Sequence, residues 1–167
     1  VENMSVFAST VIDTNDLLFV RGVGGTYDGG GGEDAIYADL SAVSTPVVFD
    51  AAVDTPYTYN GITFKNFERF LLVTGGGNDS IDGSSRNHSD HLDLGGGNDT
   101  VLAGGGSDYV DAGSGNDSIS AGLGNDTVFG GANNDVIDAG RHLAAGGREP
   151  LVPRDAGHPA IRVRRGL

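Results

Sequence analysis

The sequence predicts an all-β repeat fold, and three observations lead to that prediction. Between Thr74 and Asp138 the chain repeats itself every nine residues. Each copy carries an aspartate, followed two positions later by a large aliphatic residue such as Val101 or Val110. The first part of each copy is mostly glycine-rich, so each nonapeptide combines a loop with a strand and leaves no room for a helix.

The copies share one pattern despite local substitutions. In order they are TGGGNDSID, SRNHSDHLD, LGGGNDTVL, AGGGSDYVD, AGSGNDSIS, AGLGNDTVF and GGANNDVID. A two-residue insertion, Gly83-Ser84, separates the first copy from the second. From there the aspartates keep the nine-residue interval without a slip: Asp90, Asp99, Asp108, Asp117, Asp126 and Asp135.

These copies resemble the G-G-x-G-x-D-x-U-x nonapeptide of the repeats-in-toxin (RTX) family, in which U is a large aliphatic residue. The resemblance implies a right-handed parallel β-roll, a β-helix solenoid with Ca²⁺ stacked between glycine-rich loops. In such a roll two nonapeptides complete one turn. The resemblance also implies a module of a secreted bacterial protein, which leaves the cell through a type I secretion apparatus and folds on calcium outside it.

The rest of the chain divides around the array, which we place at residues 74–140. Residues 11–37 continue the nine-residue pattern backwards as three copies, two of them worn. Residues 38–73 interrupt it with β-branched and aromatic stretches, so residues 1–73 are expected to form a strand-rich first part of the roll. Residues 141–167 are rich in arginine and proline and lack any period. We expect this tail to be disordered, and Leu151-Val152-Pro153-Arg154 suggests a vector-derived or read-through origin.

Composition favours cations as partners. The chain of 167 residues has 29 glycines, no cysteine and a formal net charge of −13. An acidic body disfavours nucleic acid, which needs a basic face. No apolar run reaches the roughly 18–20 residues of a membrane span. Without cysteines no disulfides are available to stabilise a secreted fold, so another stabilising element is expected.

The repeat itself indicates what that element is. One buried Val, Ile or Leu per nonapeptide contributes roughly 1.5–3 kcal/mol, whereas ordering nine residues costs on the order of 1–2 kcal/mol each. Glycines let the loop adopt left-handed angles and turn carbonyl oxygens toward one point. Carbonyls plus carboxylates form an oxygen-only site that suits Ca²⁺ with its roughly 6–8 ligands better than octahedral Mg²⁺.

The RTX resemblance implies which residues share each of roughly four to six Ca²⁺ ions. A lower loop would give the carbonyls of positions two and four and its aspartate, and the loop two copies later would give those of positions one and three and its own aspartate. The resulting pairs are Gly75, Gly77 and Asp79 with Leu94, Gly96 and Asp99; Gly95, Gly97 and Asp99 with Ala112, Ser114 and Asp117; Gly113, Gly115 and Asp117 with Gly130, Ala132 and Asp135; Asp90 with Asp108; and Gly104, Gly106 and Asp108 with Ala121, Leu123 and Asp126.

Two positions depart from this pattern. The second copy has Arg86 and His88 where glycines belong, so the site at Asp90 is expected to be impaired. In the worn region Asp34 is a further candidate ligand, from the copy Gly29–Tyr37. His88 and His91 are three residues apart, but on a loop such histidines are more often solvent-exposed than zinc ligands.

The sequence gives little support for catalysis. Neither an H-E-x-x-H zinc motif nor a G-x-S-x-G elbow occurs, so we predict that this chain is not itself an enzyme, although its parent protein could be an enzyme or a toxin. The alternative function is a calcium-stabilised adhesive module that binds polysaccharide or a cell surface, for example in an adhesin or alginate-modifying enzyme. Tyr109 and Phe129 are the candidate exposed aromatics for such a face.

Overall fold

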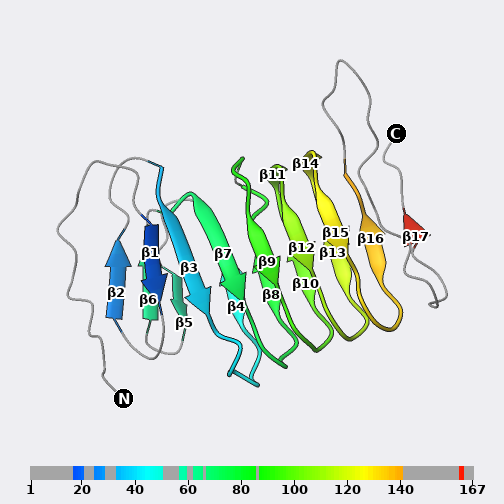
Figure 1. Ribbon diagram of the computed structural model, residues 1–167, viewed down its shortest axis with the longest axis horizontal. Coiled ribbons are helices and arrows are strands. Elements are labelled where there is room, and N and C mark those ends of the chain that lie inside the picture. The colour runs from blue at the N-terminus through cyan, green and yellow to red at the C-terminus, as the bar shows by residue number, and fades with distance from the viewer. Residues whose placement is uncertain are drawn as a thin grey trace.

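The structure is a computed structural model, and it describes residues 17–20, 25–28, 33–50, 57–59, 62–65, 67–85, 87–140 and 162–163. Within these ranges all regular structure is β-strand. Most strands lie in two six-stranded sheets, one behind the other (Figure 1). None of the described residues forms a helix long and apolar enough to cross a membrane.

The first sheet takes one strand from every turn of the chain. Its strands, in spatial order, are β1 (Leu17–Val20), β3 (Ala35–Asp39), β7 (Arg69–Val73), β9 (His91–Asp93), β12 (Tyr109–Asp111) and β15 (Thr127–Phe129). Neighbouring strands are parallel throughout. Because parallel neighbours need a crossover, the chain leaves this sheet after each strand and returns one turn later.

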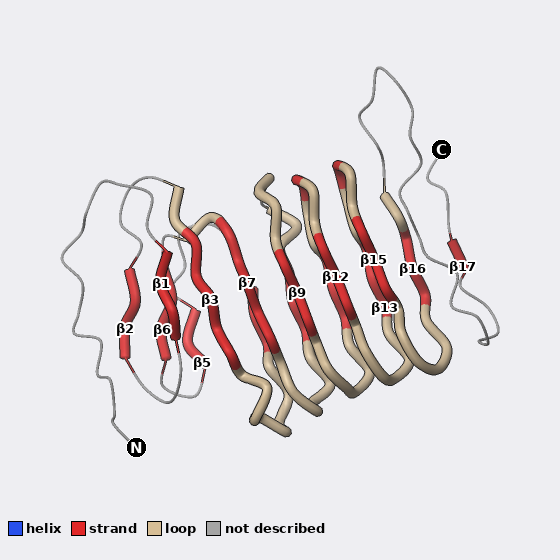
Figure 2. Tube along the Cα trace, in the orientation of Figure 1, coloured by secondary structure: helices blue, strands red, loops and turns tan. Residues whose placement is uncertain are grey.

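The second sheet receives those crossovers. Its strands, in spatial order, are β17 (Arg162–Val163), β16 (Val136–Asp138), β13 (Ser118–Ser120), β10 (Thr100–Leu102), β8 (Ser80–Asp82) and β4 (Val48–Asp50). These neighbours are parallel as well. Figure 2 shows the result, a ladder of strands joined by loops at both edges. The predicted all-β parallel roll is therefore confirmed.

Strand register shows how many repeats make a turn. Val110 pairs with Val128, and Val101 pairs with Ile119, which is an offset of 18 residues or two nonapeptides. Across the Gly83-Ser84 insertion the offset widens to 20, as in the pairing of Ile81 with Val101. The insertion is thus absorbed between strands without disturbing the alignment of the aliphatic residues.

The core consists of the middle residue of each three-residue strand. Side chains alternate along a strand, so only the middle residue of β9 or β12 points inward. The buried aliphatics of the array are Ile81, Leu92, Val101, Val110, Ile119, Val128 and Ile137. Small residues at the loop starts, such as Ala103, Ala112 and Ala121, fill the space between them. This core is narrow, with one large side chain for each nonapeptide except the copy of residues 94–102, which buries Leu94 as well as Val101.

Residues 38–73 contribute to both sheets and also build a separate one. β4 pairs with β8, and β7 pairs with both β3 and β9. Two further strands, β5 (Tyr57–Tyr59) and β6 (Ile62–Lys65), form an antiparallel pair, and β6 continues in parallel to β2 (Gly25–Asp28). The N-terminal end of the roll therefore carries a small three-stranded sheet beside the two main ones.

At the other end of the roll, β17 pairs with β16 in parallel. The remainder of residues 141–167, for which we predicted disorder, lies outside the described residues. The same holds for Arg86 and for residues 29–32 of the worn copy.

Candidate metal centre

The glycine-rich loops stack directly on one another along both edges of the roll. Gly97 and Gly115 have φ of +124° and +141°, angles that strongly favour glycine. A Cβ added at Gly115 would overlap the carbonyl oxygen of Gly97, and one at Gly97 would overlap that of Gly77. The carbonyl of position four thus lies against the next loop of the same column. Asn133 takes this position in the last copy with φ +86°, as expected for the best substitute for glycine.

Backbone hydrogen bonds hold the stacked loops at close range. The N–H of Ser114 donates to the Gly95 carbonyl at 3.0 Å, and the N–H of Ala132 donates to the Gly113 carbonyl at 2.7 Å. On the opposite edge β11 (Gly105–Gly106) and β14 (Leu123–Gly124) pair as a two-stranded parallel sheet. The carbonyls of positions two and three therefore already accept one hydrogen bond each, and a carbonyl oxygen has a second lone pair.

The aspartates form two buried ladders. The first carboxylate ladder is Asp79, Asp99, Asp117 and Asp135, and the second is Asp90, Asp108 and Asp126; all are at most 6% exposed. In each ladder the N–H of one aspartate donates to Oδ1 of the aspartate in the next turn. The distances are 2.7, 2.8 and 3.0 Å along the first ladder and 2.8 and 3.0 Å along the second.

These bonds use only one oxygen of each carboxylate. The Oδ2 atoms of Asp79, Asp99, Asp108 and Asp117 are buried and accept no hydrogen bond from the part of the chain that the structure describes. A buried ionised oxygen without a donor costs several kcal/mol, on the order of the penalty for an unpaired charge. These four oxygens therefore require a proton or a cation.

The pKa values of the central aspartates show the same imbalance. Burial raises the pKa of Asp108 to about 7, against the lowering effect of the hydrogen bond from Asp90, and the charges of Asp90 and Asp126 raise it further. Burial likewise raises the pKa of Asp99 and of Asp117 to about 6, and neighbouring aspartates of the first ladder add to the rise. Without a cation, Asp99, Asp108 and Asp117 are thus protonated more easily than an ordinary aspartate.

The donor set fits calcium. Within the described ranges no three His, Cys, Asp or Glu side chains gather as a metal cluster. A cation here would have fewer than three carboxylates as ligands, so backbone carbonyls would have to complete its coordination shell. Every donor in the loops is then oxygen, which suits a hard cation of high coordination number, and the two buried histidine-free ladders offer no soft ligand for zinc.

The structure brings most of the predicted ligands together in their expected columns. Asp79 stacks with Asp99, Asp117 and Asp135, whereas Asp108 stacks with Asp90 and Asp126. Despite the irregular loop before it, Asp90 is 5% exposed and in line with its ladder. The first loop differs from the others, because Gly75 and Gly77 lie against the carbonyls of Val43 and Thr45, in a loop without glycine.

Asp34 stands apart from both ladders. Its N–H donates to Oε2 of Glu68 at 2.7 Å, so Glu68 is the acid of the next turn. In turn Phe70, two residues further on, donates its N–H to Oδ1 of Asp90 at 2.8 Å. The second ladder therefore ends at Phe70, and Glu68, which accepts the bond from Asp34, lies two residues before Phe70.

Sequence reasoning missed two features of this region. Glu68 was not among the candidate ligands, although an acid two residues before a large apolar side chain is the spacing of the array. The asparagines of position five were also overlooked. Asn98 donates its N–H to Oδ1 of Asn78 at 2.8 Å, and the bond recurs at Asn116 and Asn134. Their recurrence every other copy was visible in the sequence.

Comparison with protein families identifies the repeat. The family model described as RTX calcium-binding nonapeptide repeat (4 copies) matches residues 71–85, 86–119 and 111–141. Comparisons with curated proteins and with solved structures give no significant match. The match covers both carboxylate ladders, and the predicted family of the array is confirmed.

Proposed function

Since residues 71–141 are RTX calcium-binding nonapeptide repeats, we propose that this chain is a calcium-dependent folding module of a larger secreted bacterial protein. It would remain unfolded in the cytosol, pass through a type I secretion apparatus and fold outside the cell. The observation that carries the proposal is the set of four buried Oδ2 atoms in the two ladders, those of Asp79, Asp99, Asp108 and Asp117, which lack a hydrogen-bond donor among the described residues.

We assign the ion ligands by column. Asp79 and Asp99 would hold one ion with the carbonyls of Gly75, Gly77, Leu94 and Gly96. The next pairs of the first ladder are Asp99 with Asp117 and Asp117 with Asp135, and those of the second are Asp90 with Asp108 and Asp108 with Asp126. When bound, calcium supplies positive charge where two carboxylates face each other. With one ion for each pair of aspartates, this assignment gives about five ions.

The residues of the array then determine when it folds. Apart from Leu94, the apolar core contributes one large side chain per nonapeptide, which is too little to order nine residues by itself. Burying the aspartates as anions adds a further cost without a counter-charge. The folding free energy must therefore include the binding free energy of the metal.

The calcium concentrations on the two sides of the membrane suit this dependence. Extracellular calcium modules have dissociation constants of about 10⁻⁴–10⁻³ M, so the low calcium concentration of the cytosol would leave the calcium sites empty. A site at ten times its dissociation constant contributes about 1.4 kcal/mol, and several sites in one stack add together. The long acidic stretch, with no positively charged residue between Arg86 and Arg141, would also resist collapse before export.

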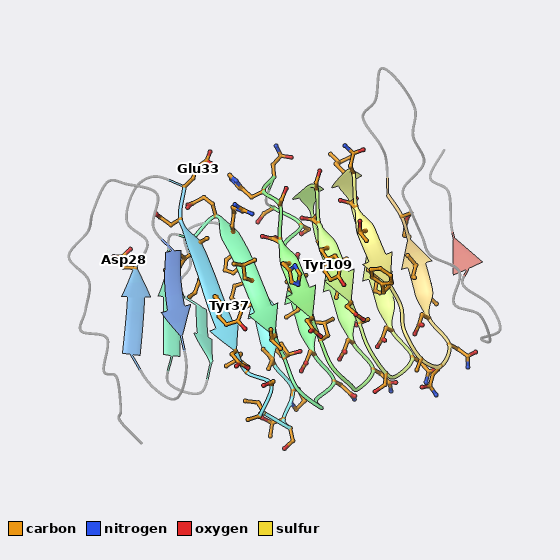
Figure 3. The ribbon with its side chains drawn as sticks, viewed as in Figure 1. Asp28, Glu33, Tyr37 and Tyr109 are labelled. Carbon is orange, nitrogen blue, oxygen red and sulfur yellow. The ribbon has the colours of Figure 1, made fainter. Side chains whose placement is uncertain are left out.

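The RTX β-roll is a structural calcium-binding fold, and we place any catalytic activity of the parent protein outside this chain. The alternative of a polysaccharide-binding face gains no support from the aromatic residues. Tyr109 lies on the outer face of β12 (Figure 3), where His91 stacks on it at 4.4 Å and Phe129 lies 5.7 Å away. His91 thus covers one face of the ring that a sugar would need, and Phe129 lies beside the ring in a tilted orientation.

Circular dichroism during a calcium titration tests the proposed function. The chain should show little strand signal in chelator and a cooperative gain at millimolar calcium, with magnesium ineffective. Asp117→Asn removes a carboxylate shared by two pairs, so the calcium midpoint should rise about tenfold, which corresponds to a loss of about 1.4 kcal/mol for each ion bound. Asp93→Asn, an exposed residue of the same array, is the matched control and should change the midpoint less than about twofold. An equal strand signal with and without calcium would refute the proposal.

A further inference from the structure

The asparagines of position five form a second, uncharged ladder beside the first carboxylate ladder. We call Asn78, Asn98, Asn116 and Asn134 the asparagine ladder. The N–H of each of the last three donates to Oδ1 of the asparagine one turn earlier, at 2.8, 2.8 and 3.1 Å. All four side chains are exposed, yet Oδ1 of Asn78, Asn98 and Asn116 each accepts a backbone N–H from the next turn. The bonds are thus between turns and involve no charged group.

The two adjacent ladders are bonded in opposite directions. The N–H of Asn98 donates back to the preceding turn, whereas the N–H of Asp99 donates forward to Oδ1 of Asp117. The same reversal occurs at Asn116 and Asp117. Each loop therefore donates one backbone N–H to an asparagine side chain of the turn before it and another to an aspartate side chain of the turn after it.

Of these two ladders, only the asparagine ladder is independent of charge. Buried carboxylates in a stack repel one another, and their geometry depends on the state of protonation or on a cation. An amide oxygen keeps its acceptor strength whatever the pH or the calcium concentration. The bonds of the asparagine ladder therefore do not themselves require a cation.

The opposite edge of the roll lacks such a ladder. Its position-five residues are Ser89, Ser107 and Asn125, and the N–H of Ser107 donates to Oγ of Ser89 at 2.8 Å. Among the described residues no hydrogen bond involves the side chain of Asn125. The two edges thus have the same type of carboxylate ladder but differ in the uncharged bonds beside it.

We propose that the asparagine ladder positions the loops of the first carboxylate ladder for calcium, and thereby lowers the calcium concentration at which the roll folds. This inference rests on the proposed function, because it concerns the same ions. The asparagines act as positioning residues, since their oxygens bond to the backbone of the next turn. Prior ordering of the loops reduces the entropy that must be lost when the ion binds.

Paired substitutions test the inference. Asn98→Ala with Asn116→Ala removes two ladder acceptors, which are worth about 1 kcal/mol each. Because several ions share that loss, the calcium midpoint from circular dichroism should rise about two- to threefold. Hydrogen exchange at the backbone N–H groups of positions 116 and 134, which lose their acceptors, should quicken about tenfold at saturating calcium. Calorimetry should still count the wild-type number of ions, since no ligand has been removed.

The matched control is Asn125→Ala, which deletes the same side chain from position five of the opposite edge. It should leave the midpoint within about 1.3-fold of wild type, as expected for a surface substitution. Asn98→Ser with Asn116→Ser should recover part of the shift, because Ser89 accepts the equivalent bond through Oγ. If alanine destabilised the loops for a reason other than the lost hydrogen bonds, serine would not restore the midpoint in this way.

The outcomes separate the two proposals. A wild-type chain that gains no strand with calcium overturns both of them. A wild-type chain that folds with calcium, while the alanine pair behaves like Asn125→Ala, overturns the ladder alone. So does a serine pair that shifts the midpoint as far as the alanine pair. A shift confined to the alanine pair and reduced by serine supports the ladder.

Discussion

The N-terminal turns and the tandem array bury different side chains at equivalent positions. In the array the ladder position is an aspartate, but at the N-terminal ends of the ladders it is Val47 or Phe70, whose N–H groups donate to Oδ1 of Asp79 and Asp90. Phe49 and Phe70 meet edge to face there, with ring centroids 4.5 Å apart. The aromatic core thus begins where the carboxylate ladders end.

This difference shows two ways to hold one fold together. Phe49, Phe67 and Phe70 are each at most 4% exposed, and a buried aromatic side chain removes about 150–250 Å² from water. Apart from Leu94, the array buries one large aliphatic side chain per copy, and it adds carboxylates with unsatisfied oxygens. We therefore expect the N-terminal turns to depend on apolar packing and the array to depend on cations.

The largest effect is expected from the aromatic core. Phe70→Ala should lower the free energy of unfolding by about 3–5 kcal/mol at saturating calcium, because it leaves a cavity between Phe49 and the first turns. Phe129→Ala, which truncates a half-buried ring on the outer face, should cost about 1 kcal/mol. Urea unfolding in millimolar calcium measures both. Equal losses would show that packing at the N-terminal end has no special weight.

A smaller loss of stability is expected when the close contact between two stacked loops of the array is disturbed. Gly115→Ala places a Cβ at φ +141° against the carbonyl of Gly97, so the variant should lose at least about 2 kcal/mol of stability in calcium. Gly76→Ala is the control, because a Cβ there meets nothing within 4 Å. Thermal unfolding at fixed calcium compares the two variants with wild type. If both variants matched wild type, the loops would not be as closely stacked as the structure has them.

The smallest effect concerns the ladders without cations. The folded pKa values of Asp99 and Asp117 (about 6) and of Asp108 (about 7) exceed the ordinary value of 3.8, so the folded array binds more protons than the unfolded chain between about pH 4 and 7. Its stability without calcium should therefore increase as pH falls through that window and decrease as pH rises through 7. Circular dichroism in calcium-free buffer should detect a modest gain of strand at pH 4.5 over pH 7.5. A loss of strand on acidification would contradict this sign.

The array could be predicted because the sequence of each copy indicates its own loop, its strand and its inward residue. A nine-residue period with one aliphatic residue per copy places Val101, Val110 and Ile119 in the core, and the structure buries all three. The aspartate ladders also follow from the period once two copies make a turn. Local sequence suffices here since every turn has the same length, so the stacking partner of each residue lies at a fixed distance along the chain.

The N-terminal turns could not be predicted in the same way. Residues 38–73 have no period, so nothing in them indicates that β4 joins one sheet and β7 the other. The pairing of Asp34 with Glu68 and of Asp90 with Phe70 depends on β7 being longer than the strands of the array, with both Phe70 and Leu72 inward.

The sequence by itself therefore determined the repeat, its inward residues and its oxygen-rich loops. The tertiary structure alone decided the register across residues 38–73 and the opposite directions of the amide and carboxylate ladders. The physical reason is that a hydrogen bond between turns joins groups 18 or more residues apart. Which oxygen meets which N–H is fixed only when the whole roll closes.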